Sequence, residues 1–347
     1  MEYFIEYVVF LAKTATIVIA VFAVLSMMVA AGQRNRRHMQ RGSLHVTHVN
    51  KDLESMQQGL QRSILDKFSL KRFNKAEKKR LKDEEKQLKT DNGEGRRRRV
   101  YVLSFDGDME ASGLESLRQE ITAVLTMAEP QDEVMLRLES PGGMVHAYGL
   151  ASSQLLRVRQ REIPLTICVD KVAASGGYMM ACVADRIIAA PFAILGSIGV
   201  LVQLPNIHRL LKKNDVDFEM ITAGEYKRTL TPFSEITEKG RDKVKEEVEE
   251  MHGLFKQWVK QYRPVVDIDI IATGETWTGT QARERKMVDS ISTSDDYIVE
   301  ACKESDVYEV NYEIRVPLGE KLGGALQKAM DKTLLTWWQR LREQRQF

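Results

Sequence analysis

The sequence is poor in cysteine and has no excess of charge of either sign. Its three cysteines, Cys168, Cys182 and Cys302, are too few and too scattered along 347 residues for a disulfide framework or a metal site. The 51 basic residues are balanced by 49 acidic ones, whereas nucleic-acid-binding proteins usually concentrate a basic excess. We therefore expect buried free thiols, no cofactor or metal, and no nucleic-acid partner.

A long uncharged stretch lies near the N-terminus. Residues 14–31 carry no charge and, as a helix, would rise about 27 Å, close to the thickness of the hydrocarbon core of a bilayer. A cleaved signal peptide would begin with basic residues, but Glu2 and Glu6 stand there instead. The sequence predicts an uncleaved transmembrane anchor over residues 1–32. The basic cluster starting at Arg34 places the rest of the chain in the cytoplasm by the positive-inside rule, with the periplasm as the alternative.

Residues 33–99 are dense in charge and poor in large apolar side chains, and they end in the basic run 96–99. Such a composition predicts a solvated juxtamembrane helix and linker. Binding of this region to anionic lipid headgroups is the alternative.

A globular pattern extends over residues 100–305. Apolar runs of strand length, such as 100–105 and 134–138, alternate with segments of helical periodicity. This alternation predicts an α/β domain with a largely parallel sheet that is covered on both faces. The apolar run 187–204 is divided by proline and glycine, so we do not interpret it as a second membrane span. No internal repeat is visible, which predicts a single catalytic core.

The C-terminal extension, residues 306–347, contains an amphipathic helical pattern with a basic opposite face. We expect the apolar face to pack on the core or on a neighbouring subunit, and an interfacial membrane helix is the alternative. The apolar face consists of Leu326, Met330, Leu334, Trp337, Trp338 and Leu341.

Three short segments carry candidate chemistry. The segment Ser140-Pro141-Gly142-Gly143 follows a predicted strand, and its glycines can expose backbone amides to an oxyanion. In a second segment, small residues surround Ser175 at a strand-to-helix junction, with Gly176 next to it. The third segment carries Lys227 after the strand-like residues 218–222. Taken singly, the three segments could be a turn, a helix N-cap and a solvated charge.

Together these segments resemble the signal peptide peptidase A family, also called protease IV, over residues 100–289. The motifs Gly-Ser-Ile-Gly-Val at 196–200 and Trp-Thr-Gly-Thr-Gln-Ala at 277–282 strengthen the likeness, whereas residues 284–286 depart from it. The resemblance implies that Ser175 is the nucleophile, that Lys227 is the general base and that Ser197 orients the lysine. It also implies an oxyanion hole built from Gly142 or Gly143 together with Gly176.

The chemistry of the residues agrees with this assignment. A serine hydroxyl needs a base, and we interpret the histidines of the globular region, His146, His208 and His252, as structural. A lysine acts as a base only when neutral, which burial in an apolar cleft favours. Ser197 could hold the amine without supplying a charge that would keep it protonated.

The resemblance further implies the ββα core shared by crotonases and the Clp protease, and a homo-oligomeric ring whose active sites can draw residues from neighbouring subunits. It implies a bacterial inner-membrane serine endopeptidase that cleaves signal-peptide remnants or misfolded membrane-derived polypeptides. We expect an apolar specificity pocket, made of Ala173, Ala174, Met179, Ile198 and Val200. An acyl-CoA crotonase enzyme and a catalytically silent membrane scaffold are the alternatives.

Overall fold

The computed structural model describes residues 42–66, 68–75, 78–79, 82 and 96–314, together with Thr14 and Thr16. The chain divides into a compact unit, Leu44–Tyr312, and a second unit that joins Met1–Ser43 to Glu313–Phe347. The predicted anchor and the predicted C-terminal amphipathic helix belong to the second unit and lie almost wholly outside the described residues. Within the described part of the chain, no helix combines the length and the apolarity that crossing a bilayer requires.

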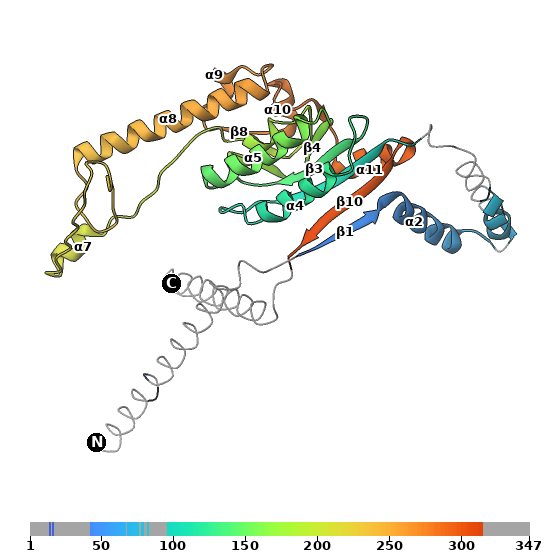
Figure 1. Ribbon diagram of the computed structural model, residues 1–347, viewed down its shortest axis with the longest axis horizontal. Coiled ribbons are helices and arrows are strands. Elements are labelled where there is room, and N and C mark those ends of the chain that lie inside the picture. The colour runs from blue at the N-terminus through green and yellow to red at the C-terminus, as the bar shows by residue number, and fades with distance from the viewer. Residues whose placement is uncertain are drawn as a thin grey trace, which may run out of the picture. The chain divides into compact units, whose positions relative to one another are not determined.

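A seven-stranded sheet forms the centre of the first unit, with the strand order β1-β10-β2-β3-β4-β6-β9 (Figure 1). Every pairing from β10 to β9 is parallel. The sheet is largely parallel, as predicted, and all five residues of β4 are buried, as expected for an apolar central strand. The strands are β1 (Ser43–His48), β2 (Arg99–Asp106), β3 (Glu133–Glu139), β4 (Leu165–Val169), β6 (Arg186–Ala189), β9 (Ser290–Ile291) and β10 (Asp306–Glu313).

Helices cover both faces of this sheet. Leu103 on β2 points into the larger core, where α4 (Leu114–Leu125), α5 (Val145–Arg159) and α6 (Gly176–Ala181) pack. The next residue back, Val102, points into a smaller core beneath α11 (Ser294–Glu304). Alternate residues of a strand face opposite sides of the sheet, so this division confirms the predicted α/β class with two covered faces.

A second, three-stranded sheet consists of β5 (Val172–Ala174), β7 (Ile194–Gly196) and β8 (Thr276–Thr278). The chain passes from β4 in the large sheet to β5 in the small one and then into α6, and it passes likewise from β6 to β7. This repeated passage is the ββα arrangement that the family resemblance implies. It brings the ends of β5 and β7 side by side, because these two strands pair in parallel.

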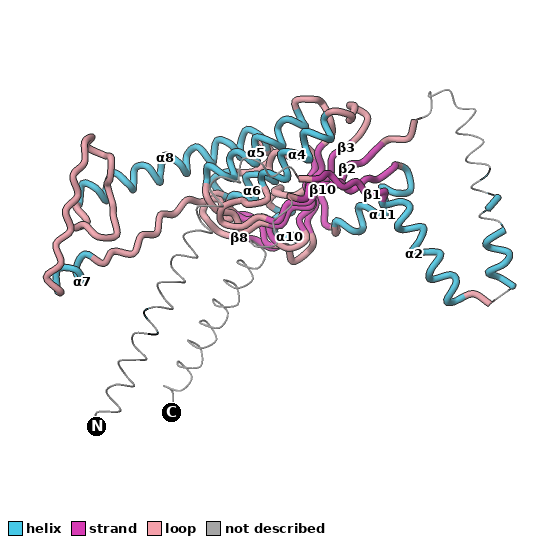
Figure 2. Tube along the Cα trace, turned by 60° about the horizontal axis from the view of Figure 1, so that its bottom comes forward, coloured by secondary structure: helices cyan, strands magenta, loops and turns pink. Residues whose placement is uncertain are grey.

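An arm extends from this body. The helix α8 (Glu238–Tyr262) packs on the core through Phe255 and Val259 near its C-terminal end, while α7 (His208–Lys213) and the start of α8 project outward (Figures 1 and 2). Residues 218–222, which look strand-like in the sequence, have no regular secondary structure and are exposed. The remaining elements are α2 (Val49–Ile64), α9 (Ile268–Ile271) and α10 (Gly279–Glu284).

The basic run 96–99 is not a solvated linker. Arg96 and Arg99 both bind the fully buried carboxylate of Asp132, at N–O distances of 2.8 Å. Burial alone would raise the pKa of Asp132, but hydrogen bonds from Arg99 and from the Glu129 amide outweigh burial and lower it to about 2. Arg98 pairs with Glu133 at 2.6 Å. These arginines therefore fasten the start of β2 to the body, an effect that the local sequence pattern does not reveal.

The three cysteines are free thiols. Cys168 and Cys182 are buried, as predicted, whereas Cys302 is half-buried. Burial raises the pKa of Cys168 to about 12. The two buried thiols therefore behave as small apolar side chains.

Candidate active site

Ser175 sits at the junction between β5 and α6 in an unusual backbone conformation, with φ 51° and ψ −118°. A non-glycine residue at positive φ costs of the order of 1–3 kcal/mol and persists only where its surroundings hold it. The Ser175 amide donates to the Gly196 carbonyl at 2.8 Å, which ties the serine to the end of β7. The side chain makes no capping hydrogen bond to α6, so the N-cap interpretation does not account for this serine. The half-buried hydroxyl is thus presented at the surface by a strained turn.

The segment 140–143 lies directly against this serine. Ser140 bridges to Ala173 of β5: its amide donates to the Val172 carbonyl at 2.8 Å, and its carbonyl accepts from Ala174 at 3.0 Å. Gly142 has φ +88°, and a Cβ added there would lie 2.7 Å from both the Ser175 Cβ and the Gly176 nitrogen. Only glycine satisfies this backbone conformation and this close approach.

The backbone amides of this segment differ in whether they already donate a hydrogen bond. The Gly142 amide donates to the Ser140 Oγ at 3.0 Å, and the Met144 amide donates to the Met109 carbonyl at 2.9 Å. The amide of Gly143, between them, donates to no acceptor among the residues that the structure describes, and the same holds for Gly176 in the first turn of α6. The amides available to an oxyanion are therefore those of Gly143 and Gly176, whereas Gly142 is already engaged.

Ser197 follows β7 at the same end of the small sheet. Gly196, which accepts the Ser175 amide, has φ +107°, and Ser197 has φ 52°. The Ser197 amide donates to the Glu275 carbonyl at 2.6 Å. The structure therefore brings Ser197 together with Ser175, Gly142, Gly143 and Gly176.

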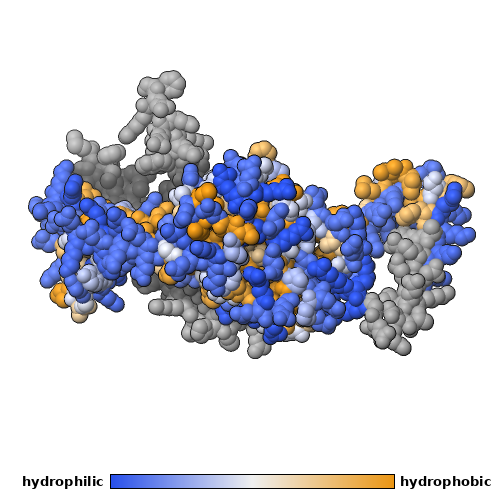
Figure 3. Space-filling model, turned by 90° about the horizontal axis from the view of Figure 1, so that it is seen from above, coloured by the Kyte–Doolittle hydropathy of each residue, from blue (hydrophilic) through white to orange (hydrophobic). Residues whose placement is uncertain are grey.

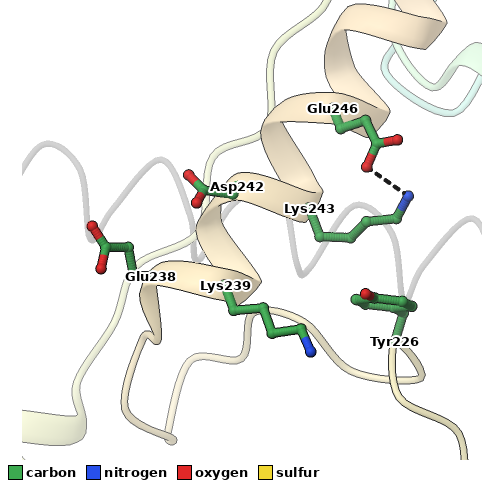
Figure 4. A pocket seen from close by; sticks show the side chains of 6 residues that line it. All are labelled: Tyr226, Glu238, Lys239, Asp242, Lys243 and Glu246. Atoms are coloured by element: carbon green, nitrogen blue, oxygen red, sulfur yellow. Dashed lines mark hydrogen bonds and ion pairs between the residues drawn. The ribbon is translucent and has the colours of Figure 1, made fainter.

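Lys227 is placed elsewhere. It is exposed, in the turn that begins at Gly224, and its amide donates to the Gly224 carbonyl at 3.2 Å. The turn rests on the first two turns of α8: Glu225 pairs with Lys239, and the ammonium groups of Lys239 and Lys243 lie 5.8 and 5.5 Å from the Tyr226 ring centre (Figure 4).

The long helix separates this turn from the core. Phe255, where α8 contacts the core, is sixteen positions after Lys239, which corresponds to about 24 Å along the helix. The fold of one chain consequently leaves Lys227 on the arm. The described residues around Lys227 in a single chain do not form the apolar cleft that we expect around a lysine base.

Other side chains near the site differ in part from expectation. Ala173, Ala174, Met179 and Ile198, predicted to line a specificity pocket, are buried in the core. The exposed apolar side chains beside residues 140–143, which we call the oxyanion segment, are instead Met109, Met144 and Val145, which the sequence reasoning missed.

The three histidines of the globular region show no second catalytic site among the described residues. His252 and His208 contact main-chain carbonyls, of Ile198 at 3.2 Å and of Phe233 at 3.1 Å, and His146 is exposed. Within the described ranges, no three His, Cys, Asp or Glu side chains are grouped to hold a metal ion.

Comparison with known proteins identifies the family. The profile of Peptidase family S49 N-terminal matches residues 2–155, and that of Peptidase family S49 matches residues 157–308. The chain belongs to Peptidase family S49. Its function class is therefore that of a peptidase, and the likeness to the protease IV family that the motifs indicated is confirmed.

Curated members of the S49 family match most of the chain. A Haemophilus influenzae protein named "Probable protease SohB" is 49% identical over 323 residues, which is 91% of each chain. A protein of the same name from Buchnera aphidicola subsp. Acyrthosiphon pisum is 50% identical over 239 residues, 69% of this chain and 71% of that protein. Among solved structures, a variant of the 1510-N membrane-bound stomatin-specific protease with a substrate peptide matches 67% of this chain and 99% of its own, at 15% identity and a TM-score of 0.43.

Proposed function

We propose that the protein is a serine endopeptidase in which Ser175 is the nucleophile. The observation that carries the proposal is the strained turn at Ser175, whose hydroxyl makes no capping hydrogen bond to α6. Beside it lie the amides of Gly143 and Gly176, which donate to no acceptor among the described residues. The Ser175 Oγ attacks the carbonyl carbon of the scissile peptide bond, and the carbonyl oxygen becomes an oxyanion. The amides of Gly143 and Gly176 donate to that oxyanion. Each such donor contributes about 10²–10³-fold to kcat in other serine peptidases.

The proposed general base is Lys227, supplied by a neighbouring copy of the chain. Two features support this arrangement: Lys227 is exposed on an arm, and the same arm exposes large apolar side chains that a partner would bury. Figure 3 shows exposed hydrophobic residues among hydrophilic ones. The apolar residues of the arm are Leu201, Val202, Leu210, Phe218 and Ile221.

A homo-oligomeric ring would follow from this contact, because an arm that reaches the next copy makes a head-to-tail interface that can close. Burial in the interface would favour the neutral amine of Lys227, and Ser197 beside Ser175 would hold that amine without a charge. The base then takes the Ser175 proton and returns it to the leaving amine.

The proposed substrates are signal-peptide remnants and misfolded or membrane-derived polypeptides at the bacterial inner membrane. The apolar stretch 14–31 supports a membrane anchor, and the basic cluster after it supports a cytoplasmic catalytic domain. The exposed Met109, Met144 and Val145 beside the oxyanion segment suit apolar substrate side chains.

The experiment that tests the proposal is labelling by a fluorophosphonate probe, together with cleavage of a casein substrate by the full chain in membranes. We expect labelling and cleavage in the wild type and neither in Ser175→Ala. Labelling that persists in Ser175→Ala would show that another residue is the nucleophile. A folded wild-type oligomer without labelling or cleavage would favour the silent scaffold or the acyl-CoA enzyme.

A further inference from the structure

Two buried hydroxyl groups lie behind the oxyanion segment. The Ser140 Oγ and the Tyr148 hydroxyl oxygen are 2.6 Å apart, and neither residue has exposed surface. The Tyr148 hydroxyl donates to the Asp108 carbonyl at 2.7 Å, and the Ser140 Oγ accepts from the Gly142 amide at 3.0 Å. The two hydroxyls therefore connect the oxyanion segment to the loop that follows β2.

The direction of each hydrogen bond follows from the number of protons. A tyrosine hydroxyl has one proton, and in Tyr148 it is donated to Asp108. Ser140 must then donate its own proton to the Tyr148 oxygen, which leaves the Ser140 Oγ free to accept from Gly142. Burial raises the pKa of Tyr148, so the hydroxyl keeps its proton. Each hydrogen bond from Gly142 through Ser140 and Tyr148 to Asp108 therefore has one defined donor.

The backbone encloses these hydroxyls tightly. A Cβ added at Gly107 would lie 2.5 Å from both the Ser140 Oγ and the Tyr148 hydroxyl oxygen. The Tyr148 ring packs on the other oxyanion donor, because a Cβ added at Gly176 would lie 2.4 Å from the Tyr148 Cγ. The Tyr148 side chain thus packs against Gly176 and bonds to Ser140, which holds the segment of Gly143.

The Gly143 amide is fixed from both sides by this arrangement. On one side, the Gly142 amide is held by the Ser140 Oγ, which is bonded directly to Tyr148. On the other side, the Met144 amide is held by the carbonyl of Met109, and the preceding carbonyl, of Asp108, is held by Tyr148. Removal of the Tyr148 hydroxyl would loosen both attachments together.

We infer that Ser140 and Tyr148 are positioning residues of the oxyanion hole, and that their hydrogen-bonded chain aims the Gly143 amide at the developing negative charge. The inference rests on the proposed peptidase function. A donor aimed in advance stabilises the transition state more than the bound substrate, so its loss lowers kcat and leaves KM unchanged.

The test compares Tyr148→Phe, Ser140→Ala and the double variant in the full chain. For each single variant we expect kcat to fall by roughly 10- to 100-fold, less than the loss of a whole donor, with KM unchanged. The double variant should be no slower than the slower single variant, because both changes break one chain. The matched control is Tyr297→Phe, which removes a hydroxyl that donates to Glu133. Glu133 is the first residue of β3, whereas the oxyanion segment follows the last one. The control variant should keep the wild-type kcat.

A second readout separates positioning from general loosening. A peptide aldehyde adds to Ser175 and forms an oxyanion, whereas the matching peptide alcohol does not. The ratio of their inhibition constants does not depend on the fraction of enzyme that is folded. We expect the variants to lose affinity for the aldehyde by the same factor as kcat and to bind the alcohol as the wild type does.

If both single variants leave the ratio of the aldehyde and alcohol inhibition constants unchanged, the inference is overturned. If Ser175→Ala is inactive while Tyr148→Phe and Ser140→Ala keep the wild-type kcat, the inference fails and the proposed function stands. If Ser175→Ala itself retains cleavage, both fail.

Discussion

The serine side and the lysine side of the proposed dyad are built in opposite ways. Ser175 follows one of two paired strands and lies against Gly142, in a segment that two buried hydroxyl groups support. Lys227 is held by an exposed turn on an arm, whose contacts are a surface ion pair and a cation–π cluster. The proposed oxyanion hole is therefore preorganised within one chain, whereas the proposed base would have to be brought to it. Loss of the oligomer should therefore lower activity more than it lowers the stability of the folded chain.

The largest effect is expected at the two reacting groups. Lys227→Arg should be as inactive as Ser175→Ala, because an arginine is not deprotonated in proteins and so cannot act as a base. Cleavage of casein measures this, with circular dichroism to check folding. Cleavage that survives in Lys227→Arg would show that Lys227 does not take the serine proton.

A smaller but still large effect is expected at the contact between the oxyanion segment and the nucleophile. Gly142→Ala should lower kcat by about 10²–10³-fold, because the new Cβ would lie 2.7 Å from the Ser175 Cβ and displace the segment that aims the donors. Gly149→Ala is the matched control: Gly149 lies in α5, and a Cβ there meets nothing within 4 Å. Equal activity of the two variants would contradict the close packing that we describe around Ser175.

The body that carries Ser175 should also show a pH-dependent stability. Glu120 on α4 is 3% exposed, and burial raises its pKa to about 7 against the opposing effect of the Tyr312 amide. A raised carboxyl pKa means that its stabilising contribution is full below pH 4.5 and is lost as the pH rises through 7. Glu120→Gln should therefore stabilise the fold by up to about 3 kcal/mol at pH 8 and by nothing at pH 4. Denaturant unfolding at the two pH values measures this, and an equal gain at both would contradict it.

The smallest effect is expected on the arm. Lys239→Ala breaks the ion pair with Glu225, whose partners are 70% and 60% exposed. Such exposed pairs are screened by solvent and contribute little to stability, so the free energy of unfolding should barely change. A large loss of stability would mean that the arm is as firmly built as the serine side.

How far the sequence predicts this site follows the same division. The neighbourhood of Ser175 and the glycines could be expected because their segments follow predicted strands, and parallel strands bring their ends to one edge. Ser197 was expected there only from the resemblance to the family. Tyr148 was not, since a tyrosine on a helix is indistinguishable in sequence from any core residue. The pairing of the run 96–99 was hidden likewise, because its partner Asp132 lies more than thirty residues away.

The helices and strands show the same limit. The alternation of strands and helices predicted the α/β class, because periodicity is local. Residues 218–222 have the composition of a strand but lie on the arm, where they pair with none of the strands that the structure describes. A strand forms only where a neighbouring strand can pair with it, and the local composition of a segment does not reveal whether such a strand lies nearby.

The most direct test of the shared dyad is complementation between two inactive chains. Ser175→Ala retains Lys227, and Lys227→Ala retains Ser175, so co-assembled copies can rebuild complete sites across an interface. We expect about one quarter of the wild-type sites to be active in a random head-to-tail mixture. The fluorophosphonate label should appear on the Lys227→Ala copies. Mixed oligomers with neither cleavage nor label would contradict a dyad shared between neighbouring chains.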